Sequence, residues 1–446
     1  MSNITDPNPI LVVGEVYVDF VQLGKGLAPK MRLGGIIHAA RGLWACGFPF
    51  AVAGICPSYL IQEATDYLHA HGCTEFIWLG EISSSPNVIF ISDVTEVGDQ
   101  GYEELLRERK SVSMREVGNQ LEKFEQIVVF PGKFSLSTLS ELLRSNANVT
   151  VDIAYGVESF LELECFKDRI QTIVISTSSD LFDALGGKCL DPLEEAARSA
   201  NASYLLLKEN RGGSRLINLI EGGVEEIHAT LGETVNSVGV GDVYAAVMAA
   251  LAPIDVNEAT WRGAQAATRY AQTTYPDDLR RDVQRDLKLP MELVRSLGGV
   301  SLPWHERTAF NIYLAAPDFS YIDKHELDEA VSALEYHNFN VRRPVQENGE
   351  VARPADIHTL REAYNKDLAL LEKCDVVFAV PLEKDPGTLV EIGYALKSRT
   401  PVITYDPRCE NKNTMVMAGS EVFSDSLGEC LNGLFSCLSK LRSTRK

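Results

Sequence analysis

The sequence predicts an α/β protein with two domains, each built around a mostly parallel β-sheet. Three observations lead to this prediction. The chain has 446 residues, which exceeds the usual length of one domain. Short β-branched runs alternate along it with helical patterns, as in layered α/β folds. The alternation stops in a charged, irregular stretch at 275–307 and then begins again. We therefore place the first domain at 8–290, a linker at 291–307 and the second domain at 308–446.

The first domain contains five apolar runs that Gly, Pro or Asp residues bound. They lie at 10–13, 127–130, 149–153, 172–175 and 204–207, and their continuous apolar character predicts buried parallel strands. Helical patterns occur between them at 37–46 and 137–145, and an apolar helix is expected at 243–251. At 16–20 and 88–94 apolar and polar residues alternate, which predicts strands with one exposed face.

The second domain shows a more regular alternation of strands and helices. Strands are expected at 310–315, 340–343, 376–380 and 402–405, and helices at 324–336, 357–372 and 388–396. This order predicts a smaller, doubly wound parallel sheet.

Composition limits the classes of partner. With 62 acidic and 42 basic side chains the formal charge is −20, which argues against binding of a nucleic acid polymer but not of small anions. Nine scattered cysteines without a CxxC pair are typical of reduced thiols. The N-terminus lacks the pattern of a signal peptide, and no apolar run is long enough to span a membrane. We expect a cytoplasmic protein without a membrane partner.

The first motif is a glycine turn before the apolar helix, Asn236-Ser-Val-Gly239-Val240-Gly241-Asp242. Such a turn lets successive backbone N–H groups point at one anion, while Asp242 can accept a proton from an attacking hydroxyl. Two other interpretations exist. The segment is an ordinary helix start with Asp242 near the positive end of the dipole, or it is a dinucleotide fingerprint, which fits less well because Tyr244 occupies the third glycine position.

This segment resembles the D-T-x-G-x-G-D signature of the ribokinase-like (PfkB) family of sugar and nucleoside kinases. Two further motifs occur in the family's order across about 270 residues: Gly14-Glu-Val-Tyr-Val-Asp19, and Gly34-Gly35 followed by His38. The resemblance implies a ribokinase-like central sheet with lid strands, and ATP and Mg²⁺ as cofactors. It implies that Asp242 is the general base and that Gly239, Val240 and Gly241 bind the γ-phosphate. Asp19, Gly35 and His38 would contact the substrate.

Three positions differ from the family pattern. Asn236 replaces the first Asp of the signature, His38 replaces an Asn, and Thr177-Ser-Ser-Asp180 is the nearest match to the N-x-x-E motif that organises Mg²⁺. The metal ligands are therefore unassigned. The same differences support an alternative in which this domain is a non-catalytic nucleotide-binding or oligomerisation scaffold.

The second motif follows the strand at 376–380 and reads Asp385-Pro-Gly-Thr388-Leu-Val-Glu391. It lies at the carboxyl end of a parallel strand, where α/β folds form their sites. Two carboxylates in a cleft suit chemistry at an acetal-like carbon, one of them as nucleophile. The alternative is a capped helix with solvated acids.

Residues 310–405 resemble the nucleoside 2-deoxyribosyltransferase family, which implies a flavodoxin- or Rossmann-like fold and no cofactor. The matching motifs are the opening Asn311 to Phe319 segment, Tyr364-Asn-Lys-Asp367 and Asp385-x-Gly-Thr-x-x-Glu391-Ile-Gly. The resemblance implies Glu391 as nucleophile, Tyr313 as the residue that positions it, and Asp367 and Asp385 as contacts to the base that assist its protonation. Asn413 resembles a residue that a neighbouring subunit lends to the site, so a homo-oligomer is expected.

Together the motifs predict a bifunctional enzyme that acts on nucleosides, nucleotides and sugars. The second domain would cleave or exchange an N-glycosidic bond through a glycosyl–Glu391 intermediate, and the first would phosphorylate a sugar or nucleoside hydroxyl. Transfer to a second base and hydrolysis both remain open. A third interpretation, a nucleotide-depleting effector, has no supporting feature in the sequence.

Overall fold

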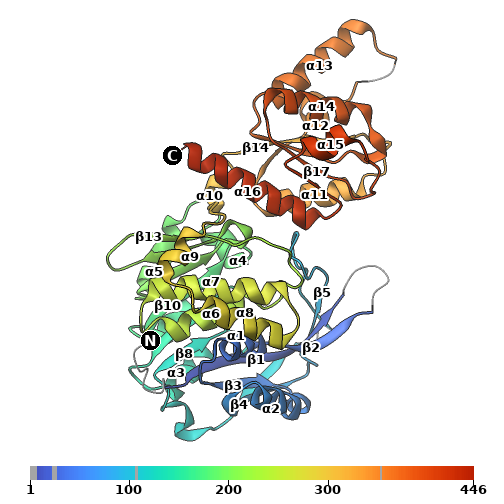
Figure 1. The fold of residues 1–446 in the computed structure, drawn as a ribbon. Coiled ribbons are helices and arrows are strands. Elements are labelled where there is room, and N and C mark those ends of the chain that lie inside the picture. Colours follow the sequence, from blue (N-terminus) through green and yellow to red (C-terminus); the bar gives the residue numbers. More distant parts are fainter. Residues whose placement is uncertain (1–7, 23–27, 106–108, 352–353, 446) are drawn as a thin grey trace. The chain divides into compact units, whose positions relative to one another are not determined.

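The computed structural model describes residues 8–22, 28–105, 109–351 and 354–445. The chain divides into two compact units. The N-terminal unit comprises Met1–Thr95 and Gln100–Ser301, and the C-terminal unit comprises Glu96–Asp99 and Leu302–Lys446. Both are α/β units with their own sheet (Figure 1). The predicted α/β fold class is confirmed.

The N-terminal unit is built on one long path of strands in the order β13-β12-β11-β10-β9-β8-β1-β3-β4-β7. Neighbours from β11 through β4 pair in parallel, and the strands at the two edges pair antiparallel. The central strands are mostly apolar and mostly buried, as their sequences predict. Apart from β1, the strands of this path are β3 (Phe50–Cys56), β4 (Cys73–Ser83), β7 (Ser111–Met114), β8 (Gln126–Val129), β9 (Asn148–Asp152), β10 (Ile170–Ser176), β11 (Tyr204–Lys208), β12 (Ser214–Asn218) and β13 (Val224–Ile227).

Strand β1 (Ile10–Val21) belongs to two sheets at once. Its first part, through Glu15, pairs with β3, and from Val16 onward it pairs with β2 (Lys30–Gly35). Strand β5 (Val88–Ile91) pairs with the same second part of β1 and with β6 (Glu103–Glu104). These are the predicted lid strands. The expectation of separate strands at 10–13 and 16–20 was wrong, because the change from continuous to alternating polarity marks a change of sheet rather than a strand end.

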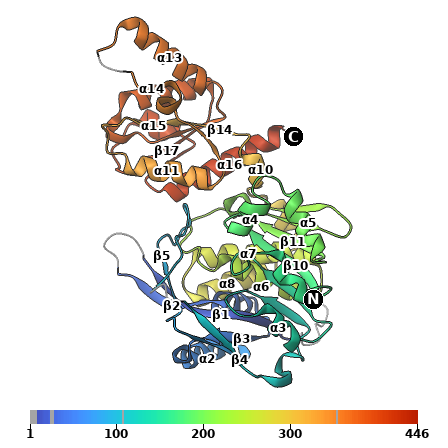
Figure 2. The ribbon, with the colours of Figure 1, turned by 180° about the vertical axis from the view of Figure 1, so that it is seen from behind.

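Helices cover both faces of the large sheet. Helices α1 (Ile36–Cys46), α6 (Val240–Leu251), α7 (Val256–Gln272) and α8 (Pro276–Asp286) lie over one face (Figure 1). Helices α3 (Leu136–Leu142), α4 (Asp180–Leu185) and α5 (Asp191–Ser199) lie over the other (Figure 2). A Cβ atom at Gly42 of α1 would lie 2.8 Å from Val243 Cγ1 of α6, so these two helices pack without space for a side chain. Helix α2 (Ile61–Ala70) packs against β4.

The segment expected to be irregular is largely helical. The stretch at 275–307 contains the whole of α8, α9 (Met291–Ser296) and α10 (Trp304–Arg307). In α8 the buried apolar residues Leu279 and Val283 are four positions apart, and charged residues fill the rest of the helix. The high density of charge concealed this narrow apolar stripe in the sequence.

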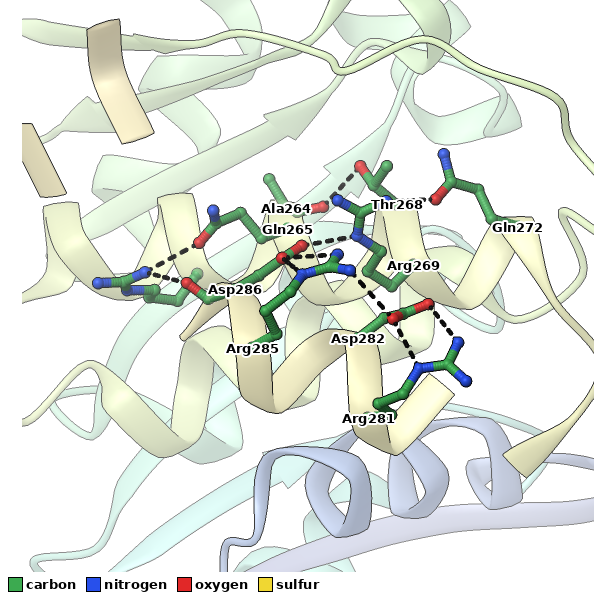
Figure 3. Close-up of polar contacts among 10 residues, drawn as sticks. Ala264, Gln265, Thr268, Arg269, Gln272, Arg281, Asp282, Arg285 and Asp286 are labelled. Atoms are coloured by element: carbon green, nitrogen blue, oxygen red, sulfur yellow. Dashed lines mark hydrogen bonds and ion pairs between the residues drawn. The ribbon is translucent and has the colours of Figure 1, made fainter. Parts of the chain in front are cut away.

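Helices α7 and α8 are joined by a polar network (Figure 3). Asp286 of α8 is nearly buried, and its carboxylate accepts hydrogen bonds from Arg269 Nε at 2.6 Å and Arg285 Nε at 2.9 Å. Asp282, one turn earlier, pairs with Arg281 and Arg285 at the surface. The Arg269–Asp286 pair therefore lies largely away from water, whereas the ion pairs of Asp282 with Arg281 and Arg285 are solvated.

We expect Asp286→Ala to lower the free energy of unfolding by about 3 kcal/mol, because Arg269 would lose its partner in a partly desolvated position. Asp282→Ala is the matched control on the same helix, and its effect should be much smaller because surface ion pairs contribute little. Urea unfolding of both variants measures the difference. Equal losses would show that the burial of Asp286 has no energetic role.

The C-terminal unit contains a five-stranded, wholly parallel sheet in the order β15-β14-β16-β17-β18. In chain order this is 2-1-3-4-5, the flavodoxin-like doubly wound arrangement. The predicted class of this domain is confirmed. The bounds are β14 (Asn311–Ala315), β15 (Asn340–Arg342), β16 (Val376–Ala379), β17 (Val402–Tyr405) and β18 (Val422–Ser424). The sequence analysis missed β18 and the helix that follows it.

In the C-terminal unit, α14 (Pro386–Ser398) and α15 (Thr414–Gly419) cover one face of the sheet, and α11 (His325–Tyr336) and α16 (Leu427–Arg445) cover the other (Figure 1). Two more helices, α12 (Pro344–Asn348) and α13 (Ile357–Leu371), precede β16. The α14 face forms a core that includes Tyr313, Val377, Ile392 and Val416. No helix among the described residues has both the length and the apolar character needed to cross a membrane.

Candidate functional site

The predicted nucleophile and its positioning tyrosine meet in the C-terminal unit. Tyr313, in the first strand β14, is completely buried, and Glu391 on α14 is half-buried. The Tyr313 hydroxyl donates a hydrogen bond of 2.6 Å to Glu391 Oε1. Strand β14 lies between β15 and β16, where the strand order reverses, and this is the position at which doubly wound sheets bind ligands.

The surroundings of Glu391 shift the pKa of its carboxyl group close to neutral pH. The pKa of Glu391 is raised to about 7, mainly by burial; the hydrogen bond from Tyr313 opposes the rise, and the carboxylates of Asp367 and Asp385 contribute to it. Burial and the negative charge of Glu391 raise the pKa of Tyr313, so the phenol remains a hydrogen-bond donor. The structure therefore brings Asp367 and Asp385 into electrostatic reach of Glu391.

The two aspartates have structural partners as well. Asp385 is the N-cap of α14, where its Oδ2 accepts from Thr388 N at 2.7 Å and from Thr388 Oγ1 at 2.9 Å. Asp367 Oδ1 accepts a hydrogen bond of 2.8 Å from Asn348 Nδ2. Asp385 thus fits both interpretations of the motif, because it caps helix α14 and also lies near Glu391. Nothing in the sequence pointed to Asn348.

Asn413 has a local role in its own chain. It is the N-cap of α15 and accepts a hydrogen bond of 2.9 Å from Met415 N. Met415 is 76% exposed, so this corner of the unit presents an apolar side chain. The contribution of Asn413 to a neighbouring subunit's site remains a prediction.

In the N-terminal unit the predicted anion turn begins α6. Gly239 is the N-cap and has a left-handed φ of 82°. The Val240 amide donates to Ser237 O at 3.1 Å, so it is already engaged. Gly241 and Asp242 are in the first helical turn, where amides have no carbonyl within the helix to bond. Of the turn that we predicted, the amides of Gly241 and Asp242 are the donors suited to an anion.

A lysine lies beside this helix start. Lys208 Nζ is 2.7 Å from Asp152 Oδ2, and a Cβ atom at Gly241 would lie 2.8 Å from the same nitrogen. Burial raises the pKa of Asp242 to about 8, and Asp152 adds to the rise while Lys208 opposes it. Asp152 and Lys208 end strands β9 and β11. The sequence analysis missed both residues, although polar residues at the carboxyl ends of predicted parallel strands were a usable signal.

The predicted substrate residues Asp19 and His38 contact each other. Asp19 is buried, and its Oδ2 is 3.0 Å from His38 Nε2 and accepts from Arg32 Nε at 3.2 Å. His38 Nδ1 is 2.6 Å from the Tyr270 hydroxyl. This network assigns the ring proton to Nε2, facing the carboxylate. The pKa of Asp19 is lowered because His38 and Arg32 outweigh the opposing effect of burial.

The glycines explain how these motifs fit together. A Cβ atom at Gly34 would lie 1.9 Å from Asp19 Oδ1, and one at Gly239 would lie 2.1 Å from His38 Cγ. Gly35 has a positive φ of 61° at the turn from β2 into α1. The glycine pair therefore leaves space for Asp19, and the anion turn lies directly against His38. Motifs about 200 residues apart in the sequence form one site.

The positions that differ from the kinase pattern have clear local roles. Asn236 is buried, accepts from Arg32 Nη2 at 3.1 Å and donates to Val238 O at 3.1 Å. Asp180 is exposed in the first turn of α4, and the Thr177 hydroxyl is buried without a hydrogen-bond partner. Within the described ranges no group of three or more His, Cys, Asp or Glu side chains is arranged to hold a metal ion.

Several solved structures are similar to the N-terminal part of the chain. Ribokinase from Thermotoga maritima is 16% identical, and the match covers 63% of this chain and 100% of that one with a TM-score of 0.44. Arabidopsis thaliana ribokinase complexed with ribose and ATP is 14% identical, with 64% and 100% covered and a TM-score of 0.45. Burkholderia thailandensis nucleoside kinase in complex with inosine is 12% identical, with 63% and 97% covered and a TM-score of 0.45.

No curated protein matches the sequence. A family model does match, and it covers the segment that holds Tyr313, Asp367, Asp385 and Glu391. The resemblance inferred from the C-terminal motifs is confirmed. Residues 312–433 match the family described as nucleoside 2-deoxyribosyltransferase.

Proposed function

We propose that the protein is a bifunctional enzyme of nucleoside and sugar metabolism. The C-terminal unit cleaves or exchanges the N-glycosidic bond of a (deoxy)nucleoside or nucleotide, and the N-terminal unit transfers a phosphoryl group from ATP to a hydroxyl. The observation that carries the first half is the 2.6 Å hydrogen bond from Tyr313 to Glu391, inside the segment that matches the transferase family.

In the glycosidic reaction, the deprotonated Glu391 carboxylate attacks the anomeric carbon. The bond from this carbon to the base nitrogen breaks, and its electron pair leaves with the base, which takes a proton from Asp367 or Asp385. The resulting glycosyl ester of Glu391 is then cleaved by a second base or by water. Tyr313 holds Oε1, which leaves the other carboxylate oxygen for the attack.

We expect Tyr313→Phe to move the acidic limb of the pH–rate profile to higher pH. The Tyr313 hydrogen bond lowers a Glu391 pKa of about 7, so its loss raises that pKa and reduces the reactive carboxylate at neutral pH. The rate of base release, measured from pH 5 to 9, checks this expectation. Tyr394→Phe is the control, because it removes a tyrosine–glutamate hydrogen bond at the surface of the same helix. An unshifted profile in Tyr313→Phe would contradict the assigned role.

In the phosphoryl transfer, Asp242 takes the proton from the substrate hydroxyl as the hydroxyl oxygen attacks the γ-phosphorus. Bound ATP would supply the transferable group together with Mg²⁺ on its phosphates. The first-turn amides of α6 and the Lys208 ammonium stabilise the developing negative charge. The raised pKa of Asp242, about 8, suits a general base that works near neutrality.

The most direct test is an analysis of the products formed from a nucleoside and nucleotide panel, with and without an acceptor base and ATP. A new nucleoside indicates transfer, a free sugar or sugar phosphate indicates hydrolysis, and label from radiolabelled ATP in a sugar or nucleoside indicates the kinase step. No base release from any compound would refute the C-terminal assignment. No labelled product would refute the N-terminal one.

A second candidate applies to the N-terminal unit alone, which would bind nucleotide or support oligomerisation without catalysis. The observation that favours it is the engagement of Asp19 Oδ2 by both Arg32 and His38, which reduces its capacity for sugar hydroxyls. Calorimetric binding of ATP in a protein that shows no turnover would support this alternative. Turnover would exclude it.

We also propose that the enzyme is a homo-oligomer in which Asn413 and its exposed neighbour Met415 face a second copy. Sedimentation of the full chain tests this proposal, and a monomer at assay concentrations would exclude it.

A further inference from the structure

A cluster of cationic and aromatic side chains lies behind His38 in the N-terminal unit. We call it the Tyr270 cluster, and it consists of Arg32, His38, Arg41, Tyr67 and Tyr270. The Tyr270 hydroxyl is 2.6 Å from His38 Nδ1 and accepts a hydrogen bond from Arg41 Nη1 at 3.4 Å. Arg41 Nε also donates to the Tyr67 hydroxyl. His38 and Arg41 are three residues apart on α1, so they share one face of that helix.

The charges of this cluster do not balance. Arg32 and Arg41 bring two positive charges, and among the described residues Asp19 is the one carboxylate in contact with the cluster, where it is paired with Arg32. His38 adds no third positive charge, because burial and both arginines lower its pKa against the opposing effect of Asp19, and the ring stays neutral. Arg41 is only partly exposed, and its hydrogen-bond partners in the described part of the chain are two phenols. The cluster with Asp19 therefore carries one excess positive charge.

A partly buried guanidinium without a carboxylate partner is an unusual arrangement. Phenol oxygens satisfy its N–H groups but do not compensate its charge, and an uncompensated charge away from water is costly. Burial also raises the pKa values of Tyr67 and Tyr270, so both hydroxyls stay protonated. The Tyr270 proton is donated to His38 Nδ1, whereas the Tyr67 hydroxyl accepts from Arg41 and keeps a proton that it can donate. Guanidinium groups together with a hydroxyl donor are groups that proteins use to hold a phosphate monoester.

The cluster also adjoins the positions where the proposed chemistry occurs. His38 contacts Asp19 through Nε2, and its ring lies against Gly239 at the start of the anion turn. Arg32 reaches from lid strand β2 to Asp19 and to Asn236, which precedes the same turn. An anionic group of the substrate would thus lie close to the hydroxyl-binding carboxylate and on the substrate side of α6.

We infer that the N-terminal site takes a pentose phosphate, with the phosphate monoester held by Arg41 and Arg32 and a sugar hydroxyl directed to Asp242. This inference rests on the proposed kinase function and specifies its substrate class. It also fits a reaction order, because cleavage of a nucleoside 5′-monophosphate by the C-terminal unit releases a pentose 5-phosphate. The phosphoryl step is unchanged: the sugar hydroxyl loses its proton to Asp242, and its oxygen forms the new bond to the γ-phosphorus as the bond to ADP breaks.

Isothermal titration calorimetry of the full chain tests the inference without requiring turnover. The probes are ribose 5-phosphate, ribose, inorganic phosphate and inosine 5′-monophosphate. We expect ribose 5-phosphate to bind at least tenfold more tightly than ribose or inorganic phosphate, and Arg41→Gln to remove most of that advantage while leaving the affinity for ribose unchanged. Arg280→Gln is the matched control, because Arg280 is an exposed arginine that stacks on Trp44 of the same helix as Arg41.

Three outcomes would overturn the inference. Equal affinity for ribose and ribose 5-phosphate would show that the site has no phosphate subsite. Equal affinity for inorganic phosphate and ribose 5-phosphate would show that the sugar contributes nothing to binding. A loss in Arg41→Gln that is confined to inosine 5′-monophosphate makes a nucleotide the ligand. If Arg41→Gln does not fold, Tyr67→Phe, which removes one hydroxyl from the cluster, should weaken ribose 5-phosphate selectively. Bound ribose 5-phosphate that is never phosphorylated would refute the kinase proposal and leave the binding inference standing.

Discussion

Glu391→Gln is expected to abolish base release, with a loss on the order of 10⁴-fold, since an amide cannot form the glycosyl ester. Glutamine has the shape of glutamate and keeps an oxygen that can accept the Tyr313 hydrogen bond of 2.6 Å, so the fold should be preserved. Chromatographic detection of the free base, in single-turnover conditions, measures the loss. Mass spectrometry of the wild-type protein mixed with substrate should show the covalent glycosyl adduct, and the variant should lack it.

The matched control is Glu372→Gln. Glu372 also accepts a hydrogen bond from a tyrosine, Tyr394, but at the surface. This control should retain full activity and full adduct formation. Base release by Glu391→Gln at a rate near that of the wild type would remove Glu391 from the nucleophile role and leave Tyr313 and Glu391 as a structural pair.

Asp242→Asn is expected to reduce phosphoryl transfer by roughly 10²–10⁴-fold, which is the usual contribution of a general base. The affinity for ATP should change much less, because the first-turn amides and Lys208 remain. Transfer of label from radiolabelled ATP to the sugar substrate measures the rate, and calorimetry measures the affinity. Asp277→Asn is the control, since Asp277 is another acidic residue in the first turn of a helix, but on the exposed surface of α8.

The same substitution has a separate effect on stability. Burial raises the pKa of Asp242 to about 8, so the folded protein retains a proton that the unfolded chain releases near pH 4. This contribution is present in full below about pH 4, falls as the pH rises above that value, and is lost once the pH has passed about 8. Asp242→Asn cannot ionise, so its melting temperature relative to the wild type should rise between pH 5 and pH 9. A constant difference would show that Asp242 is not desolvated.

Much of the fold was predictable because strand polarity is a local property of the sequence. The strands at 127–130, 149–153 and 204–207 and the alternation from 310 to 405 correspond to observed elements. The errors at β1 and α8 share a physical cause: the polarity of a segment indicates which residues are buried, but not where an element begins or ends. Strand β1 changes sheets without a break in the chain, and the amphipathic helix α8 has only a narrow apolar stripe among its charges.

The sites divide in a similar way. Residues in compact motifs, such as Asp242 and Glu391, could be named from the sequence because the motif itself sets their geometry. Arg32 and Tyr270 could not, because their partners lie 204 and 232 positions away in the chain. Such contacts depend on how β2 and α7 pack in three dimensions. The excess positive charge around Tyr270 is invisible in a sequence whose overall charge is −20.

The contact between Gly239 and the His38 ring links two events that are usually considered separately. A ligand that displaces His38 changes the space available to the turn that begins α6, and an anion held at that turn limits where the ring can go. By thermodynamic reciprocity, each ligand must then alter the affinity of the other by the same factor. Sugar and nucleotide would therefore bind as an interdependent pair.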